Sequence, residues 1–176
     1  TAVTRFVCRD LESKGAAEGC NISTIEINCR NIDTKYRVLA EIGNRLAEEG
    51  DDTIPFTGWP ADKVFNRVRA RMQARAGVHV IVLDEIDHLV RKGTEGDDLL
   101  YSLTRLNIGL IDGAFCCVIG ISNDLAFTEM LDPRVQSRLP AQHPQKTNQP
   151  PPTNLLIIIL LLRKILRRSQ LLPLPD

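Results

Sequence analysis

Val78-His79-Val80-Ile81-Val82-Leu83-Asp84-Glu85-Ile86-Asp87 is an apolar run that ends in two adjacent carboxylates. Such a run of mostly β-branched residues predicts a strand buried on both faces, as in a parallel sheet. Charged side chains at its end are expected at the carboxyl edge of the sheet, where open α/β sheets bind ligands. The alternative is a core strand followed by a solvated acidic turn, and this stretch alone does not separate the two interpretations.

The order of the carboxylates fits a nucleotide hydrolase, in which this arrangement is called Walker B. Asp84 would hold Mg²⁺ directly or through water, and Glu85 would orient and polarise the attacking water. Both roles require the two side chains to lie beside a bound nucleotide.

Length and composition indicate one soluble globular domain. A chain of 176 residues is long enough for a sizeable core. The net charge is zero, but residues 1–140 hold 17 basic and 21 acidic side chains, and residues 141–176 hold five and one. The five cysteines form no CxxC pair, so we expect reduced core thiols in a cytosolic protein. The chain shows no initiator Met and no signal segment, and we expect it to begin inside a longer sequence.

Hydrophobic periodicity alternates between helical and strand patterns up to residue 139. The expected strands are 22–29, 78–84 and 114–123, and the expected helices are 1–14, 34–46, 61–75, 97–106, 124–131 and 133–139. Residues 88–96 are expected to form a polar connection, with Asp97 as the cap of the helix that follows. The alternation predicts a parallel sheet with helices on both faces, and a further strand before Thr1.

Residues 140–176 depart from this pattern. Seven of the ten prolines lie there, and residues 142–153 are polar and Pro-rich. The apolar block 155–162 is far shorter than the ~20 residues that span a bilayer, so no membrane association is predicted. A basic amphipathic helix on a membrane surface is the alternative. We therefore predict a partial core domain over 1–139 and an irregular tail over 140–176 that is not native to it.

Four blocks in order resemble one known family, the archaeal origin-recognition initiators of the Orc/Cdc type, which are AAA+ ATPases. The loop Phe56-Thr57-Gly58-Trp59-Pro60 is similar to that family as well. The four blocks are Ile81–Val90, Leu99–Arg105, Ile119–Leu125 and Leu131–Leu139. The resemblance implies a three-layer α/β AAA+ P-loop NTPase core with a parallel sheet, truncated at both ends.

The resemblance also implies site residues for ATP and Mg²⁺. Asp84 and Glu85 match Walker B, and Asn123 matches sensor 1, whose amide can hold the γ-phosphate or the lytic water. The alternative for Asn123 is a cap on the next helix, a task for which Asp124 is also available. Thr1 matches the hydroxyl that follows the phosphate-binding loop and ligates Mg²⁺.

Arg138 matches the position of an arginine finger that reaches a neighbouring subunit's nucleotide. A guanidinium suits that task because it forks onto phosphate oxygens and stays charged. Arg134 lies one helical turn away on the same face and is a competitor. Either arginine could instead be a solvated helix residue.

The implied function is that of an ATP-dependent replication initiator. Such proteins bind double-stranded origin DNA with other initiator subunits, help to load the replicative helicase, and work in the cytoplasm with the nucleoid. Because the loop lysine and glycines do not precede Thr1 in this sequence, we expect this fragment to bind Mg-ATP weakly and to be inactive alone. The alternatives are a clamp loader, a helicase loader, or a non-enzymatic remnant that serves as an interaction fragment.

The helix expected at 61–75 carries basic residues at 63, 67, 69, 71 and 75. This face could contact the DNA backbone, in which case Arg67 and Arg71 would contribute to salt-dependent binding. A solvated basic face is the alternative.

Overall fold

The computed structural model describes residues 2–32, 34–91, 93–111, 113–124, 126–137 and 156–160. Its strands are β1 (Ile22–Asn28), β2 (Gly77–Asp84), β3 (Ala114–Ser122) and β4 (Leu156–Leu160). Its helices are α1 (Ala2–Ala17), α2 (Lys35–Arg45), α3 (Ala61–Arg75), α4 (Asp87–Val90), α5 (Thr94–Gly109), α6 (Phe127–Met130) and α7 (Pro133–Gln136).

The strands form one sheet in the order β1-β2-β3-β4. The first three are parallel, and β4 runs antiparallel to β3. The register pairs Asn28 with Asp84 across β1 and β2, and Leu83 with Gly120 across β2 and β3. The carboxyl ends of the three parallel strands therefore meet at one edge of the sheet, as the sequence predicted.

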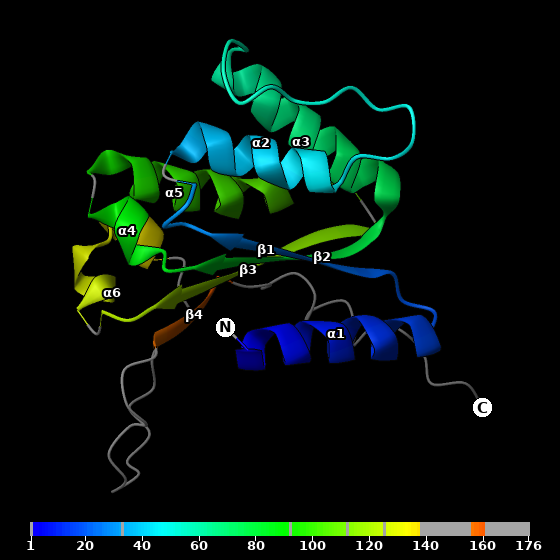
Figure 1. Cartoon of the computed structure of the whole chain (residues 1–176), viewed down its shortest axis with the longest axis horizontal. Coiled ribbons are helices and arrows are strands. Elements are labelled where there is room, and N and C mark those ends of the chain that lie inside the picture. The colour runs from blue at the N-terminus through cyan, green and yellow to red at the C-terminus, as the bar shows by residue number, and fades with distance from the viewer. Residues whose placement is uncertain are drawn as a thin grey trace, which may run out of the picture.

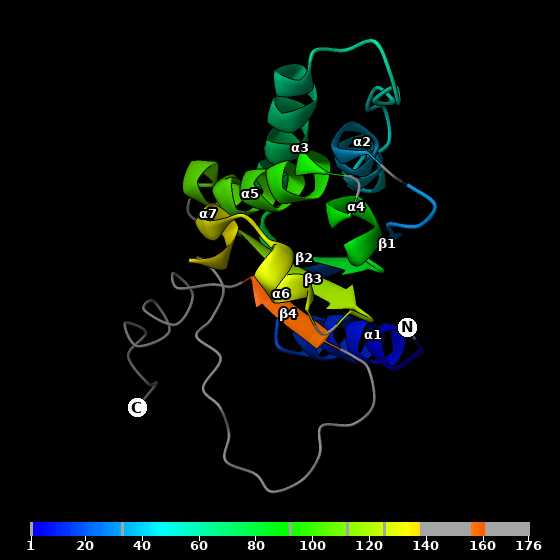
Figure 2. The same cartoon turned by 90° about the vertical axis from the view of Figure 1, so that its left-hand side faces the viewer.

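The molecule has three layers, with α1 on one face of the sheet and α2, α3 and α5 on the other (Figures 1 and 2). Side chains at alternate positions of β2 pack on opposite faces of the sheet. Ile81 and Leu83 join the larger core beneath α2, α3 and α5, whereas Val80 and Val82 join a smaller core that contains Cys8 of α1. A strand covered on both sides is apolar at most positions, which explains the apolar residues from Val80 to Leu83.

Local capping rules account for several helix starts. The Thr34 hydroxyl accepts a hydrogen bond from the Arg37 backbone N–H at the start of α2. Asp132 caps α7 in the same way, with Pro133 in the first turn. The predicted helix over 61–75 is confirmed at both ends.

Two expectations for the region after β2 are wrong. Residues 87–90 form the short helix α4, and α5 begins at Thr94 rather than after a cap at Asp97. The Asp97 carboxylate instead accepts a hydrogen bond of 2.9 Å from the backbone N–H of Asp132. The Asp97 side chain therefore makes a tertiary contact with Asp132 instead of capping α5.

The tail also differs from the prediction in one segment. Residues 156–160 pair with Val118–Ser122 as β4, where an irregular chain was expected. The proposed boundary between 139 and 140 stays a prediction.

Three of the five basic residues of α3, Arg67, Arg71 and Arg75, pair with acidic residues that follow α2. Arg71 is 4% exposed and donates a 2.8 Å hydrogen bond to the Gly43 carbonyl and another to the Asp52 carbonyl. Its Nε makes no well-aligned hydrogen bond but lies 3.3 Å from the Asp51 carboxylate. Arg67 pairs with Asp52. The hypothesis that Arg67 and Arg71 bind DNA is therefore unsupported, because both side chains already pair with acidic residues of this chain. Helical periodicity shows which residues share a face but does not reveal such ion pairs.

Candidate nucleotide site

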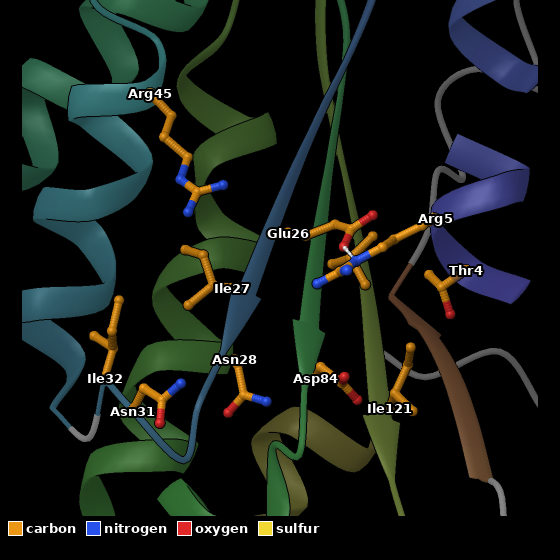
Figure 3. A pocket seen from close by; sticks show the side chains of 11 residues that line it. Thr4, Arg5, Glu26, Ile27, Asn28, Asn31, Ile32, Arg45, Asp84 and Ile121 are labelled. Carbon is orange, nitrogen blue, oxygen red and sulfur yellow. Dashed lines mark hydrogen bonds and ion pairs between the residues drawn. The ribbon is translucent and has the colours of Figure 1, made fainter. Parts of the chain in front are cut away.

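The carboxyl edge of the sheet opens into a cavity of about 300 Å³. Figure 3 shows Asp84 and Asn28 beside each other at the ends of neighbouring strands, with α1 on one side and α2 on the other. Six of its eleven lining residues are charged or carry an amide, and Arg5 of α1 donates to the Glu26 carboxylate at 3.0 Å. The lining residues are Thr4, Arg5, Glu26, Ile27, Asn28, Asn31, Ile32, Arg45, Val82, Asp84 and Ile121.

Asp84 is the last residue of β2, at the carboxyl edge where the sequence predicted it, and it lines this cavity. Glu85 follows in a left-handed conformation, with φ of 53°. Its backbone N–H donates to the Asp84 carboxylate at 3.1 Å. Left-handed backbone is unfavourable for a residue with a Cβ and tends to occur where function fixes the chain. The sharp turn points the chain away from β2 immediately after Asp84.

Asn123 follows the last residue of β3 and is exposed. The turn that continues from it is capped by Asp124, whose carboxylate accepts from the Ala126 N–H at 3.0 Å and from Arg91 at 2.7 Å. The hydrogen bond from Arg91 holds the pKa of Asp124 below its usual value. Asp124 thus closes the turn before α6, whose N-cap is Ala126 without a side-chain cap bond, and Asn123 stays a candidate for contact with phosphate or water.

Two polar residues of this edge were not predicted from the sequence. Asn28 ends β1 as Asp84 ends β2, and the same signal, a polar residue closing an apolar strand, could have found it. Asp87 was quoted in the opening stretch without a role. The residue is 6% exposed, and its carboxylate accepts from the Ser122 hydroxyl at 3.2 Å.

Cys29 lies directly behind the site, where its backbone N–H donates to the Asp84 carbonyl at 2.8 Å. Burial, and then the negative charge of Asp84, raises the pKa of its thiol to about 12. The thiol therefore stays protonated at neutral pH and is a packing group rather than a nucleophile.

Of the two arginine-finger candidates, Arg134 lies within the residues that the structure describes and Arg138 does not. Arg134 binds the Asp132 carboxylate through Nε and a terminal nitrogen, both at 2.9 Å, and lies 5.2 Å from the centre of the Tyr101 ring. Its guanidinium is therefore held against its own subunit. Arg138 and Thr1 lie outside the described residues, so their roles stay predictions.

The residues present fit a Mg-nucleotide. In the described part of the chain, no three His, Cys, Asp or Glu side chains are grouped so that they could hold a metal ion. Mg²⁺ in nucleotide sites usually takes one or two carboxylates and completes its shell with phosphate oxygens and water. Asp84, half-buried in the cavity, can supply such a carboxylate.

A parallel sheet between two helical layers, with an Asp-Glu pair at its carboxyl edge, is the arrangement expected of an AAA+ P-loop NTPase core, and the similarity to solved structures supports that class. Among solved structures, the chain resembles the Aeropyrum pernix ORC1 protein in complex with DNA, with a TM-score of 0.64 and 39% identity over 78% of this chain and 33% of that one. The Aeropyrum pernix ORC2 protein, solved as ADPNP–ADP complexes, shares the fold at 20% identity and a TM-score of 0.61, over 76% and 34% of the two chains.

Curated relatives make the assignment more specific. The chain is 49% identical over 146 residues to the ORC1-type DNA replication protein of Methanoculleus marisnigri, covering 79% of this chain and 34% of that protein. It is 48% identical over 139 residues to ORC1-type DNA replication protein 1 of Methanosarcina acetivorans, covering 79% and 32%. The chain therefore belongs with the ORC1-type DNA replication proteins and spans about a third of their length.

No protein-family model matches the chain. None of the helices within the described ranges is long and apolar enough to cross a membrane.

Proposed function

We propose that this chain contributes to the nucleotide site of a replication initiator that binds and hydrolyses ATP. The observation that carries the proposal is the register pairing of Asp84 with Asn28 in the cavity, with Glu85 next in sequence in its left-handed turn. The names of the relatives, which are DNA replication proteins, favour the initiator over a clamp loader or an unrelated remnant.

Each residue at the edge has a distinct task in this proposal. ATP with Mg²⁺ would supply the γ-phosphoryl group and the charge that draws an attacking water toward it. Asp84 contributes a carboxylate to the metal, and Glu85 orients the water and accepts its proton. Asn123 donates its amide to the phosphate or the water without adding charge. Arg138 serves a neighbouring subunit's site, since Arg134 is held by Asp132.

DNA binding is the second element of the proposed function. The ORC1 structure that this chain resembles at 39% identity is a complex with DNA. We propose that the whole protein binds double-stranded origin DNA with other initiator subunits, helps to load the replicative helicase, and acts on the nucleoid in the cytoplasm. The paired arginines of α3 are not assigned to that contact.

A chimera tests the proposal, because the chain spans only part of its relatives. The matching 139-residue segment of the Methanosarcina acetivorans relative would be replaced by the corresponding part of this chain. We expect Mg²⁺-dependent ATP binding, and salt-dependent binding of the relative's origin duplex. A folded chimera that binds neither ligand, beside an intact relative that binds both, would contradict the proposal.

A further inference from the structure

The turn that carries Glu85 is tied to the neighbouring strand β3 by hydrogen bonds immediately after it. The Ile86 N–H donates to the Ile121 carbonyl at 3.1 Å. One residue further on, the Asp87 carboxylate accepts from the Ser122 hydroxyl at 3.2 Å. Asp87 is 6% exposed and Ser122 is fully buried, so water does not compete freely for this second contact.

Glu85 itself needs such support. Its φ of 53° is unfavourable for a residue with a Cβ, and it persists only where the surrounding structure fixes the chain on both sides. On the N-terminal side, the Glu85 N–H is held by the Asp84 carboxylate at 3.1 Å. On the C-terminal side, the support comes from Ile121 and Ser122 of β3.

The Ser122 hydroxyl also reaches the turn that follows Asn123. Its oxygen accepts from the Asp124 N–H at 3.0 Å. The Asp124 carbonyl is a second acceptor for the hydroxyl proton, but it lies farther away, at 3.4 Å, and is uncharged. A carboxylate is the stronger acceptor, which favours the bond to Asp87. One side chain thus lies between the turn of Glu85 and the turn of Asn123.

We infer that Ser122 and Asp87 are positioning residues, which hold Glu85 in its left-handed conformation and fix it relative to Asn123. This inference rests on the proposed function only for the role of Glu85 in orienting water. The contacts of Ser122 and Asp87 that carry it form without nucleotide. Neither side chain touches substrate in this assignment, because both are buried behind the turns that they connect.

The test is NMR spectroscopy of the 176-residue chain without nucleotide. The three-bond coupling between the amide and α protons of Glu85, together with its Cα and Cβ shifts, distinguishes left-handed from right-handed backbone. Ser122→Ala is expected to raise the ratio of right-handed to left-handed Glu85 at least about fivefold, since one buried hydrogen bond to a charged group is lost. Ser122→Thr keeps a hydroxyl and is expected to restore the wild-type signature.

Ser23→Ala is the matched control, because Ser23 also lies in a strand and its hydroxyl contacts a side chain, His79, away from this turn. It should leave Glu85 unchanged. If Ser122→Ala does not fold, Asp87→Leu removes the same contact from the other side. A folded Ser122→Ala or Asp87→Leu protein with the wild-type Glu85 signature would overturn the inference. Because this readout needs no nucleotide, a failure of the proposed ATPase function would leave its outcome unaffected.

Discussion

The hydroxyl of Ser23 in β1 lies 2.7 Å from Nδ1 of His79 in β2. The other ring nitrogen, Nε2, lies 2.9 Å from the Met72 carbonyl of α3. A carbonyl can only accept, so Nε2 carries a proton. Burial disfavours the charged ring by lowering its pKa, and in the neutral ring Nδ1 accepts from the Ser23 hydroxyl. The ring thus joins two strands and a helix.

This geometry predicts a pH dependence of stability. Burial lowers the pKa of His79 below its usual value of 6.5. The unfolded chain therefore binds a proton on this ring more readily than the folded chain does. The free energy of unfolding should fall as the pH drops from about 6.5 toward the folded-state pKa, and should level off below it.

Urea unfolding between pH 7.5 and about 4.5 measures this effect. His79→Gln should lose the part of the pH dependence that the ring contributes, while the dependence due to other groups stays. Equal pH slopes in the two proteins would mean that His79 titrates alike in the folded and unfolded states.

The left-handed turn predicts an unusual order of stabilities at residue 85. Glycine adopts positive φ at little cost, whereas alanine pays a steric penalty. Glu85→Gly should therefore be more stable than Glu85→Ala by about 1 kcal/mol, although glycine is ordinarily the less stable of the two. Thermal or urea unfolding of both variants provides the comparison. An alanine variant at least as stable as the glycine variant would argue against the left-handed assignment.

The arginines of α3 should differ strongly in their contribution to stability. Arg71→Met leaves the Gly43 carbonyl without its donor and Asp51 without its partner, so we expect a loss of about 3 kcal/mol. Arg67→Met breaks a partly exposed ion pair with Asp52 and should cost at most about 1 kcal/mol. Urea unfolding measures both losses. Similar small losses would show that the loop does not depend on the buried guanidinium.

The sequence predicted those parts of the fold that follow from periodicity and strand-end chemistry. Helix 61–75 was predicted at both ends, and Asp84 was expected at the sheet edge because it directly follows a run that is typical of a buried parallel strand. Contacts between distant segments were not predictable. Asp97 bonds to Asp132, 35 residues away, and Arg71 reaches Gly43, 28 residues away.

For the candidate site, Asp84 and Glu85 were proposed because carboxylates follow an apolar strand, and Asn123 because it matches sensor 1 of the family that the sequence resembles. Their roles in a nucleotide site stay predictions. Asn28 was missed although it closes an apolar strand as Asp84 does. Asp87 was missed because its contact with Ser122 depends on strand order. The φ of Glu85 could not be predicted, because no local signal requires a left-handed conformation for a glutamate.

The central claim is that Asp84 and Glu85 serve a bound nucleotide. Single-turnover ATP hydrolysis by the chimera, with binding measured separately, tests it most directly. Glu85→Gln should retain Mg²⁺-dependent ATP binding and lose turnover by at least about 100-fold, because the general base is removed. Asp84→Asn should weaken the Mg²⁺ dependence of binding. Turnover within twofold of the unsubstituted chimera in the folded Glu85→Gln protein would contradict the account.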